Sequence, residues 1–104
     1  MNVTAIAEEA FAYNTGITHV DLSDTQVTAI PEGCFMGDTR LKTVILPDTA
    51  TNIGKNAFSG TTADVYINNP ACTITDAFDK NYNGVIYGYK YSDEANNVES
   101  PAYK

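Results

Sequence analysis

A five-residue step from isoleucine to phenylalanine recurs along the chain. It occurs in "IAEEAF" at Ile6–Phe11, "IPEGCF" at Ile30–Phe35 and "IGKNAF" at Ile53–Phe58, and "ITDAF" at Ile74–Phe78 is one residue shorter. A spacing of five fits neither the period of 2 of a strand face nor the three- or four-residue spacing of a helix stripe. The successive phenylalanines are 24, 23 and 20 residues apart. A repeat of this length predicts a solenoid of stacked coils.

Short aliphatic segments follow each phenylalanine and predict strands. In "LKTVIL", Leu41–Leu46, the alternation over Val44 and Leu46 indicates a short strand with one buried face. Stacked coils would place like residues in columns. We predict four columns: Ile6, Ile30, Ile53 and Ile74; Phe11, Phe35, Phe58 and Phe78; Val20, Val44, Val65 and Val85; and Leu22, Leu46, Ile67 and Tyr87.

The residues between the strands predict how each coil turns. "LSDTQVTAI" and "LPDTATNI" each carry an Asp-Thr pair, which is turn chemistry. The polar pair after each Ile, followed by a small residue and Phe, predicts one tight helical turn. The small residues Ala10, Cys34, Ala57 and Ala77 would let neighbouring coils approach closely. Ser92, followed by two acidic residues, predicts the start of a short terminal helix that closes the solenoid.

Size and charge narrow the classes of function. A chain of 104 residues is one domain, and its 43% hydrophobic content is typical of a globular protein. A net charge of −7, with only six Lys plus Arg, argues against nucleic acid and anionic membrane surfaces as partners. The chain contains neither an apolar run of about 18 residues, as membrane insertion requires, nor a signal-peptide pattern at its start.

The repeat unit resembles a known family. "LKTVILPDTATNIGKNAFSG", Leu41–Gly60, is similar almost position for position to the unit of the BspA-type leucine-rich repeats, and "VIYGYKYSDEANNV" is similar to that family's C-terminal ending. The resemblance covers Val3 to Val98. Two features depart from it: the Cys that often follows the "AF-x-G" step is absent, with Asn14, Asp38 and Thr61 near that place, and the third and fourth units are short.

The resemblance implies the architecture. We expect a β-rich α/β repeat, a right-handed leucine-rich-repeat solenoid of about four coils with a short parallel strand ladder, tight helical turns and a C-terminal cap. The single domain would span 1–104, with coils at about 3–26, 27–49, 50–70 and 71–89 and a cap at 90–104. Because the first unit begins mid-repeat at Val3, we expect a C-terminal piece of a longer solenoid. Its exposed N-terminal coil would be open to self-association.

The outward face of the strand ladder is the predicted interaction site. Ile45, Tyr66 and Ile86 would form an exposed apolar column about three coils long, and exposed apolar patches often mark interaction sites. The predicted protein-binding residues are Asp21, Thr43, Ile45, Asp64, Tyr66 and Ile86. Two alternatives stay open: these side chains stabilise the ladder as cross-strand neighbours, or another part of the parent protein covers them.

Other candidate chemistry favours a structural interpretation. His19 lies beside Thr18 on the outward side of a strand and has no identifiable catalytic partner. "DKNYNG", Asp79–Gly84, matches the first half of an EF-hand loop, but Lys90 stands where the bidentate Glu belongs, so we expect a turn. Cys34 and Cys72 would lie in different columns two coils apart, too distant for a disulfide. We therefore predict no catalytic residue, no metal site and no cofactor.

The C-terminal tyrosines form a cluster, comprising Tyr82, Tyr87, Tyr89, Tyr91 and Tyr103. We interpret them as a cap over the last coil, with a carbohydrate-stacking site as the less favoured alternative. The resemblance implies a non-catalytic protein-binding module of a bacterial cell-surface or secreted protein, adhering to host or matrix proteins or to neighbouring domains. A structural spacer in a larger surface protein and a carbohydrate-binding module are the other hypotheses.

Overall fold

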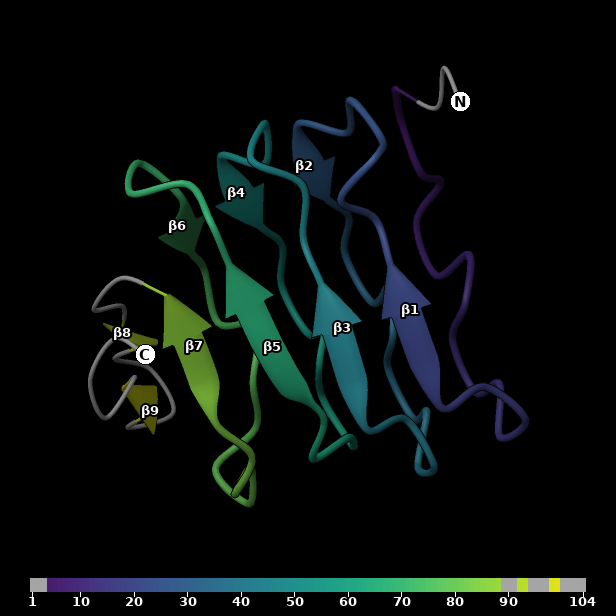
Figure 1. The fold of residues 1–104 in the computed structure, drawn as a ribbon. Coiled ribbons are helices and arrows are strands. Elements are labelled where there is room, and N and C mark those ends of the chain that lie inside the picture. Colours follow the sequence, from purple (N-terminus) through teal and green to yellow (C-terminus); the bar gives the residue numbers. More distant parts are fainter. Residues whose placement is uncertain (1–3, 89–91, 94–97, 100–104) are drawn as a thin grey trace.

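The computed structural model describes residues 4–88, 92–93 and 98–99. Two parallel sheets carry the fold (Figure 1). The first sheet has the order β1-β3-β5-β7, with β1 at His19–Asp21, β3 at Thr43–Ile45, β5 at Asp64–Ile67 and β7 at Ile86–Gly88. The second has the order β2-β4-β6, with β2 at Ala29–Ile30, β4 at Asn52–Ile53 and β6 at Thr73–Ile74. A separate antiparallel pair joins β8, Ser92–Asp93, to β9, Val98–Glu99.

The chain alternates between the two sheets, so the molecule is a β-solenoid of about three turns. The strands β1, β3 and β5 of the first sheet are each followed by a turn and then by a strand of the second sheet, which lies behind the first in Figure 1. All pairing within both sheets is parallel and joins equivalent places in successive coils, such as Val20 with Val44 and Ile30 with Ile53. The division of the chain into four coils stays a prediction.

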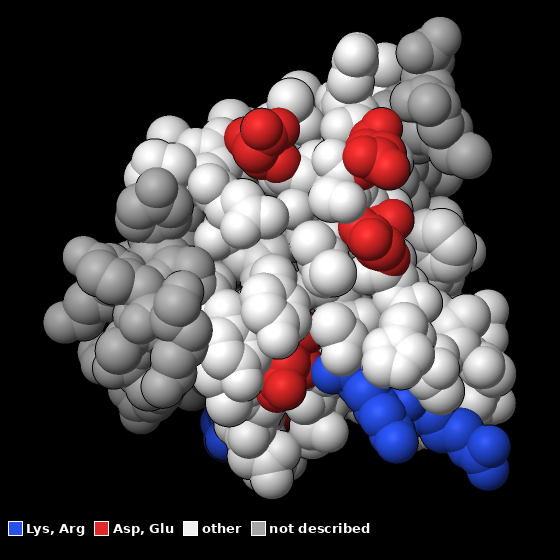
Figure 2. Space-filling model, viewed as in Figure 1, with Lys and Arg blue, Asp and Glu red and all other residues white. Residues whose placement is uncertain are grey.

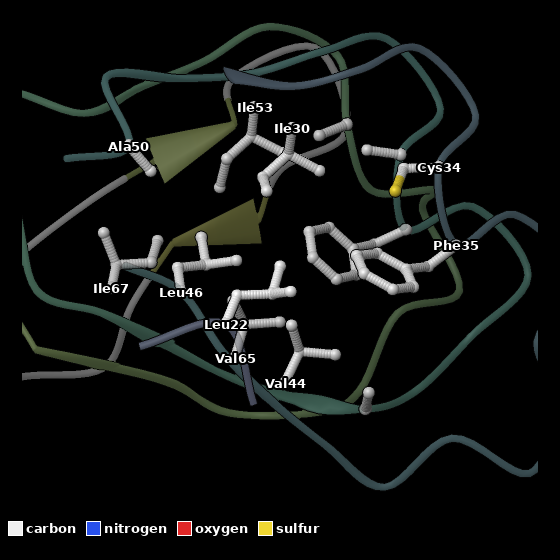
Figure 3. Packing of buried hydrophobic residues seen from close by; sticks show 14 of the residues in the cluster. Leu22, Ile30, Cys34, Phe35, Val44, Leu46, Ala50, Ile53, Val65 and Ile67 are labelled. Atoms are coloured by element: carbon white, nitrogen blue, oxygen red, sulfur yellow. The ribbon is translucent and has the colours of Figure 1, made fainter. Parts of the chain in front are cut away.

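The core contains the predicted columns of like side chains, except at β7, where Ile86 replaces Val85 and Tyr87 lies on the outward face. Ile30, Ile53 and Ile74 are register partners across the second sheet. Phe35 and Phe58 are fully buried, and their ring centroids lie 5.3 Å apart in a stacked arrangement. Figure 3 shows the isoleucines and phenylalanines facing the aliphatic residues of the first sheet, including Val44, Leu46, Val65 and Ile67. Because each coil covers its apolar face with the next, burial holds the stack together.

The phenylalanine column extends from Phe11 to Phe78. Phe11 stacks on Phe35 at 5.6 Å, and Phe58 on Phe78 at 5.2 Å. Tyr82 then packs on Phe78 with centroids 4.5 Å apart, and its hydroxyl donates a hydrogen bond of 2.8 Å to the carbonyl of Ala63. Tyr82 therefore covers the end of the ring column, as expected of a capping tyrosine. Tyr89, Tyr91 and Tyr103 lie outside the described residues.

The Ile-to-Phe corners differ from the prediction, because they are turns rather than helical turns. No helix occurs in the described residues. In the second coil, the N–H of Cys34 donates to the carbonyl of Pro31 and the N–H of Met36 to that of Gly33, both at 3.2 Å. The residue two before each Phe has a positive φ, which a right-handed helix excludes; these residues are Glu9 (55°), Gly33 (65°), Asn56 (60°) and Asp76 (50°).

Hydrogen bonds between coils replace those that a helix would have made. The N–H of Phe11 donates to the carbonyl of Cys34 at 3.1 Å, and the N–H of Phe35 to that of Ala57 at 2.8 Å. The N–H of Phe58 does the same to Ala77 at 2.9 Å. Cys34, Ala57 and Ala77 are buried at this contact, so the predicted role of a small residue before Phe is confirmed for these coils.

The last strand of the ladder lies one residue away from its predicted register. Val65 pairs with Ile86, and Tyr66 with Tyr87. Ile86, predicted to face outward, is buried at 1% exposure and takes the column position predicted for Val85. The connection after Phe78 uses one more residue than the one after Phe58, since it forms a turn in which the N–H of Tyr82 donates to the carbonyl of Asp79 at 3.1 Å.

The predicted terminal helix is wrong at its start. Ser92 and Asp93 form β8 and pair with β9, so Ser92 is not the first residue of a helix. In the antiparallel pair, backbone groups of β8 bond to those of β9. The predicted helix would have satisfied its backbone groups within one segment. Glu94 and the rest of the predicted helix fall outside the described residues.

In the described part of the chain, no helix has the length and apolarity to cross a membrane.

Candidate functional site

The outward face of the four-stranded sheet carries one side-chain column that crosses every strand. Asp21, Ile45, Tyr66 and Tyr87 are register partners in successive strands. The residues on either side of Ile45 and Tyr66 are buried; they are Val44, Leu46, Val65 and Ile67. Side chains along a strand alternate between the two faces in this way. We call Asp21, Ile45, Tyr66 and Tyr87 the outward column.

The exposure of the outward column varies along the sheet. Asp21 is exposed, Ile45 and Tyr87 are half-buried, and Tyr66 has 36% of its surface exposed. The Tyr66 and Tyr87 rings are stacked, with centroids 4.5 Å apart and an interplanar angle of 11°. The two rings therefore lie against each other on neighbouring strands. The outward placement of Asp21, Ile45 and Tyr66 is therefore as predicted.

Ile86 does not belong to this face. The side chain of Ile86 is buried in the core beside Val65. Tyr87 occupies the outward position that was predicted for Ile86. The signal for Tyr87 was weak in the sequence, because "VIY" places three strand-forming residues in a row without alternation. The two aromatic residues now adjoin on neighbouring strands, which makes the exposed part of the column more aromatic than predicted.

Polar groups beside the outward column are held by hydrogen bonds. Thr43 and Asp64 are register partners on the neighbouring row, and both are half-buried. The Asp64 carboxylate accepts a 3.0 Å bond from the backbone N–H of Val85. At the β1 end of the outward column, Oδ1 of Asp21 accepts hydrogen bonds from the Ser23 hydroxyl at 2.6 Å and from the Ser23 N–H at 2.9 Å. These bonds lower the pKa of Asp21, the hydroxyl bond most strongly, and keep it ionised.

Acidic side chains gather where the strands of the first sheet end. Asp24 and Asp48 occupy equivalent places in the turns that follow β1 and β3, and both are exposed. With Asp21 they form what we call the acidic rim. Figure 2, drawn from the side of the first sheet, shows Asp and Glu over the upper part of this face and a further acidic patch lower down, beside the Lys and Arg of the lower edge. The exposed Arg40 and Lys42 precede β3 on that lower side.

The remaining candidates lie in the row beside the outward column or inside the core. His19 is exposed at the start of β1, on the outward face, and is the register partner of Thr43. Cys34 and Cys72 are free and buried. Burial, and then the charge of Asp38, raise the pKa of the Cys34 thiol to about 12, and burial raises that of Cys72 to about 11. Thiols with such pKa values are protonated at neutral pH and are poor nucleophiles or ligands.

The half EF-hand sequence forms a turn, as predicted. The carboxylate of Asp79 accepts bonds from the N–H of Asn81 at 2.9 Å and of Gly60 at 2.8 Å. Both carboxylate oxygens are thus engaged in backbone hydrogen bonds. Among the described residues, no group of three or more His, Cys, Asp and Glu side chains is placed to hold a metal ion.

Parallel short strands, corners closed by stacked phenylalanines and a repeat of 20 to 24 residues define a leucine-rich-repeat solenoid. The model of the BspA type leucine rich repeat region matches residues 1–83 in six copies, and the chain belongs to this family. Searches of curated proteins and of solved structures gave no match. Leucine-rich repeats are generally non-catalytic protein-interaction modules, and the BspA type is typical of surface proteins.

Proposed function

We propose that this chain is a non-catalytic protein-binding module of a bacterial cell-surface or secreted protein, and that it adheres to host or matrix proteins through the outward face of its first sheet. The observation that carries the proposal is the stacked pair of the exposed Tyr66 and the half-buried Tyr87 beside Ile45. Interfaces are rich in such aromatic anchors, which bury large areas with few rotamers to order.

The arrangement of the face supports this role. The sheet is fixed by parallel pairing on both sides of Ile45 and Tyr66, so a partner would meet a rigid surface at little entropic cost. Polar groups lie beside the apolar centre, namely those of Asp21, Thr43 and Asp64. Protein interfaces usually have this arrangement of an apolar centre and a polar rim.

The test uses purified 104-residue protein against immobilised extracellular matrix proteins, with binding followed by biolayer interferometry. Tyr66→Ala and Ile45→Asp are expected to reduce binding at least about tenfold each, as loss of a central anchor typically does. Tyr13→Ala is the matched control, because Tyr13 is more exposed, at 67%, but lies on a corner. If neither Tyr66→Ala nor Ile45→Asp changes binding while circular dichroism shows an intact fold, this face is not the binding surface.

A structural spacer in a larger surface protein is the second candidate. It is favoured by the half-burial of Ile45 and Tyr87, since cross-strand neighbours of this kind also stabilise a ladder. The spacer role predicts that Tyr66→Ala lowers the unfolding midpoint but that the wild-type protein binds none of the immobilised proteins. Protein-binding and spacer roles therefore give opposite results in the same experiment.

A further inference from the structure

We propose that the partner of the outward sheet face is a cationic polypeptide segment, whose Arg or Lys side chains pair with the acidic rim while its backbone and apolar groups cover Ile45 and Tyr66. This inference rests on the proposed function and specifies the class of partner. The acidic rim, Asp21, Asp24 and Asp48, consists of exposed carboxylates at the ends of adjacent strands.

The charge distribution selects the sign of the partner. The chain carries a net charge of −7, and Figure 2 shows that the cationic side chains of this face are confined to one edge. Ionised carboxylates attract cations over about 10 Å at 0.1 M salt, which guides an approaching segment toward the rim. The hydrogen bonds from Ser23 hold the Asp21 carboxylate in one orientation, so its charge is presented without further ordering.

The same charges restrict how a second copy of this chain could bind. Two copies facing each other through the first sheet about a twofold axis parallel to the strands would bring one acidic rim against the other, whereas an axis across the strands would bring the rim toward the cationic edge. Like charges at an interface reduce affinity. A partner that carries Lys or Arg has no such penalty.

The geometry of the aromatic pair disfavours a sugar as the ligand. A pyranose ring packs on the open face of an aromatic side chain. One face of the Tyr66 ring is covered by Tyr87, at 4.5 Å between centroids and 11° between planes, and Ile45 is its neighbour on the preceding strand. A ring with neighbours on both strands beside it offers less open face to a sugar, whereas tyrosine hydroxyls can hydrogen-bond to a polypeptide backbone or to guanidinium groups.

The test compares two twelve-residue peptides with the full 104-residue protein, by fluorescence anisotropy at 50 mM and 300 mM NaCl. One peptide repeats Gly-Arg-Ser four times, and the other has Glu in place of each Arg. We expect measurable binding of the Arg peptide only, weakened at the higher salt concentration because the charges are exposed.

Matched variants distinguish the rim from general electrostatic attraction. Asp21→Asn/Asp24→Asn/Asp48→Asn removes three charges from the rim. Glu8→Gln/Glu9→Gln/Glu32→Gln removes three exposed charges from the corners. The rim variant is expected to weaken binding of the Arg peptide by about fivefold or more, as three exposed ion pairs would allow, and the corner variant by less than about twofold. Thermal unfolding confirms that each variant is folded.

Each remaining outcome overturns the proposal. Equal loss in both variants would mean that net charge, and not this face, attracts the peptide. Binding of the Glu peptide, or no binding of the Arg peptide, would exclude a cationic partner. If Tyr66→Ala abolishes matrix-protein binding while the rim variant leaves it unchanged, the proposed function stands and the cationic partner is wrong.

Discussion

The carboxylate of Asp38 reaches across one coil and accepts a hydrogen bond of 2.7 Å from the backbone N–H of Asn14. Asp38 is completely buried, and its second carboxylate oxygen has no hydrogen-bond partner among the described residues. Asp38 lies three residues after Phe35. The equivalent residues of the neighbouring coils, Asn14 and Thr61, are uncharged. A charge at this point of the core is therefore costly to bury.

Replacing this charge should stabilise the protein in a pH-dependent way. Burial raises the pKa of Asp38, and the bond from Asn14 opposes that rise only in part. The folded state therefore holds this proton to a higher pH than the unfolded state, whose carboxyl titrates near 3.9. The Asp38 contribution to stability falls as pH rises from about 3.9 through the folded pKa, and stays low above it.

Asp38→Asn keeps the acceptor for Asn14 and removes the charge. We expect it to raise the free energy of unfolding by about 1 kcal/mol at pH 7 and to have little effect at pH 3, where both states of the wild type are protonated. Urea unfolding at the two pH values measures this difference. A variant less stable than wild type at pH 7 would show that the charged carboxylate is favourable in the core.

The stacked phenylalanines are expected to contribute unequally. Phe35 is buried between the rings of Phe11 and Phe58, whereas Phe11 is only half-buried. Phe35→Ala should therefore lower the free energy of unfolding by about 3–5 kcal/mol, and Phe11→Ala by about half of that or less. Urea unfolding of both variants provides the comparison. If the two variants lost the same free energy of unfolding, burial of a ring on both sides would not explain the stability of the column.

Gly84 is required by the close approach of two coils. A Cβ at this position would lie 2.5 Å from the carbonyl oxygen of Thr62 and 2.6 Å from that of Ala63. Gly84→Ala is expected to cost about 1–3 kcal/mol of stability, since backbone cannot move away easily. Gly16→Ala is the control, because its nearest atom would be Asn14 Oδ1 at 3.5 Å. Similar melting temperatures for the two variants would contradict the packing at β7.

The columns could be predicted from the sequence because their cause is periodic. One apolar residue per coil at a fixed place, such as Ile30 and Ile53, has only one way to be buried in a solenoid, and the structure pairs them. The same repeat predicted that Asp21, Ile45 and Tyr66 lie side by side on the outward face, and they are register partners. The exposed acids Asp24 and Asp48 were visible as the repeated Asp-Thr pair, although they were first interpreted only as turn residues.

The corners and the last register could not be predicted from residue patterns of this kind. The positive φ values at Glu9 and Asn56 are set by hydrogen bonding between coils, which the spacing of hydrophobic residues does not reveal. The available signal was that Gly, Asn and Asp tolerate a positive φ. The position of Ile86 depends on one extra residue in the turn after Phe78. A shift of one residue exchanges the two faces of a strand, which is why Ile86 and Tyr87 were interchanged.

The thiols should be unreactive in the folded protein. Both cysteines are buried, with pKa values raised to about 12 and about 11, so the thiolate is scarce at pH 8. We expect a disulfide reagent such as DTNB to label neither Cys34 nor Cys72 within minutes in buffer and to label both in 8 M urea. Rapid labelling of the native protein would mean that its coils open around these residues.

The most direct test of the binding surface places a photo-crosslinking amino acid, p-benzoylphenylalanine, at position 66 or, as control, at position 13. Both positions carry exposed tyrosines, but Tyr66 lies on the outward sheet face and Tyr13 on a corner. After irradiation with an immobilised matrix protein that the wild type binds, we predict a covalent adduct from position 66 and little from position 13. An adduct from position 13 alone, or equal adducts from both, would contradict the assignment of the sheet face as the binding surface.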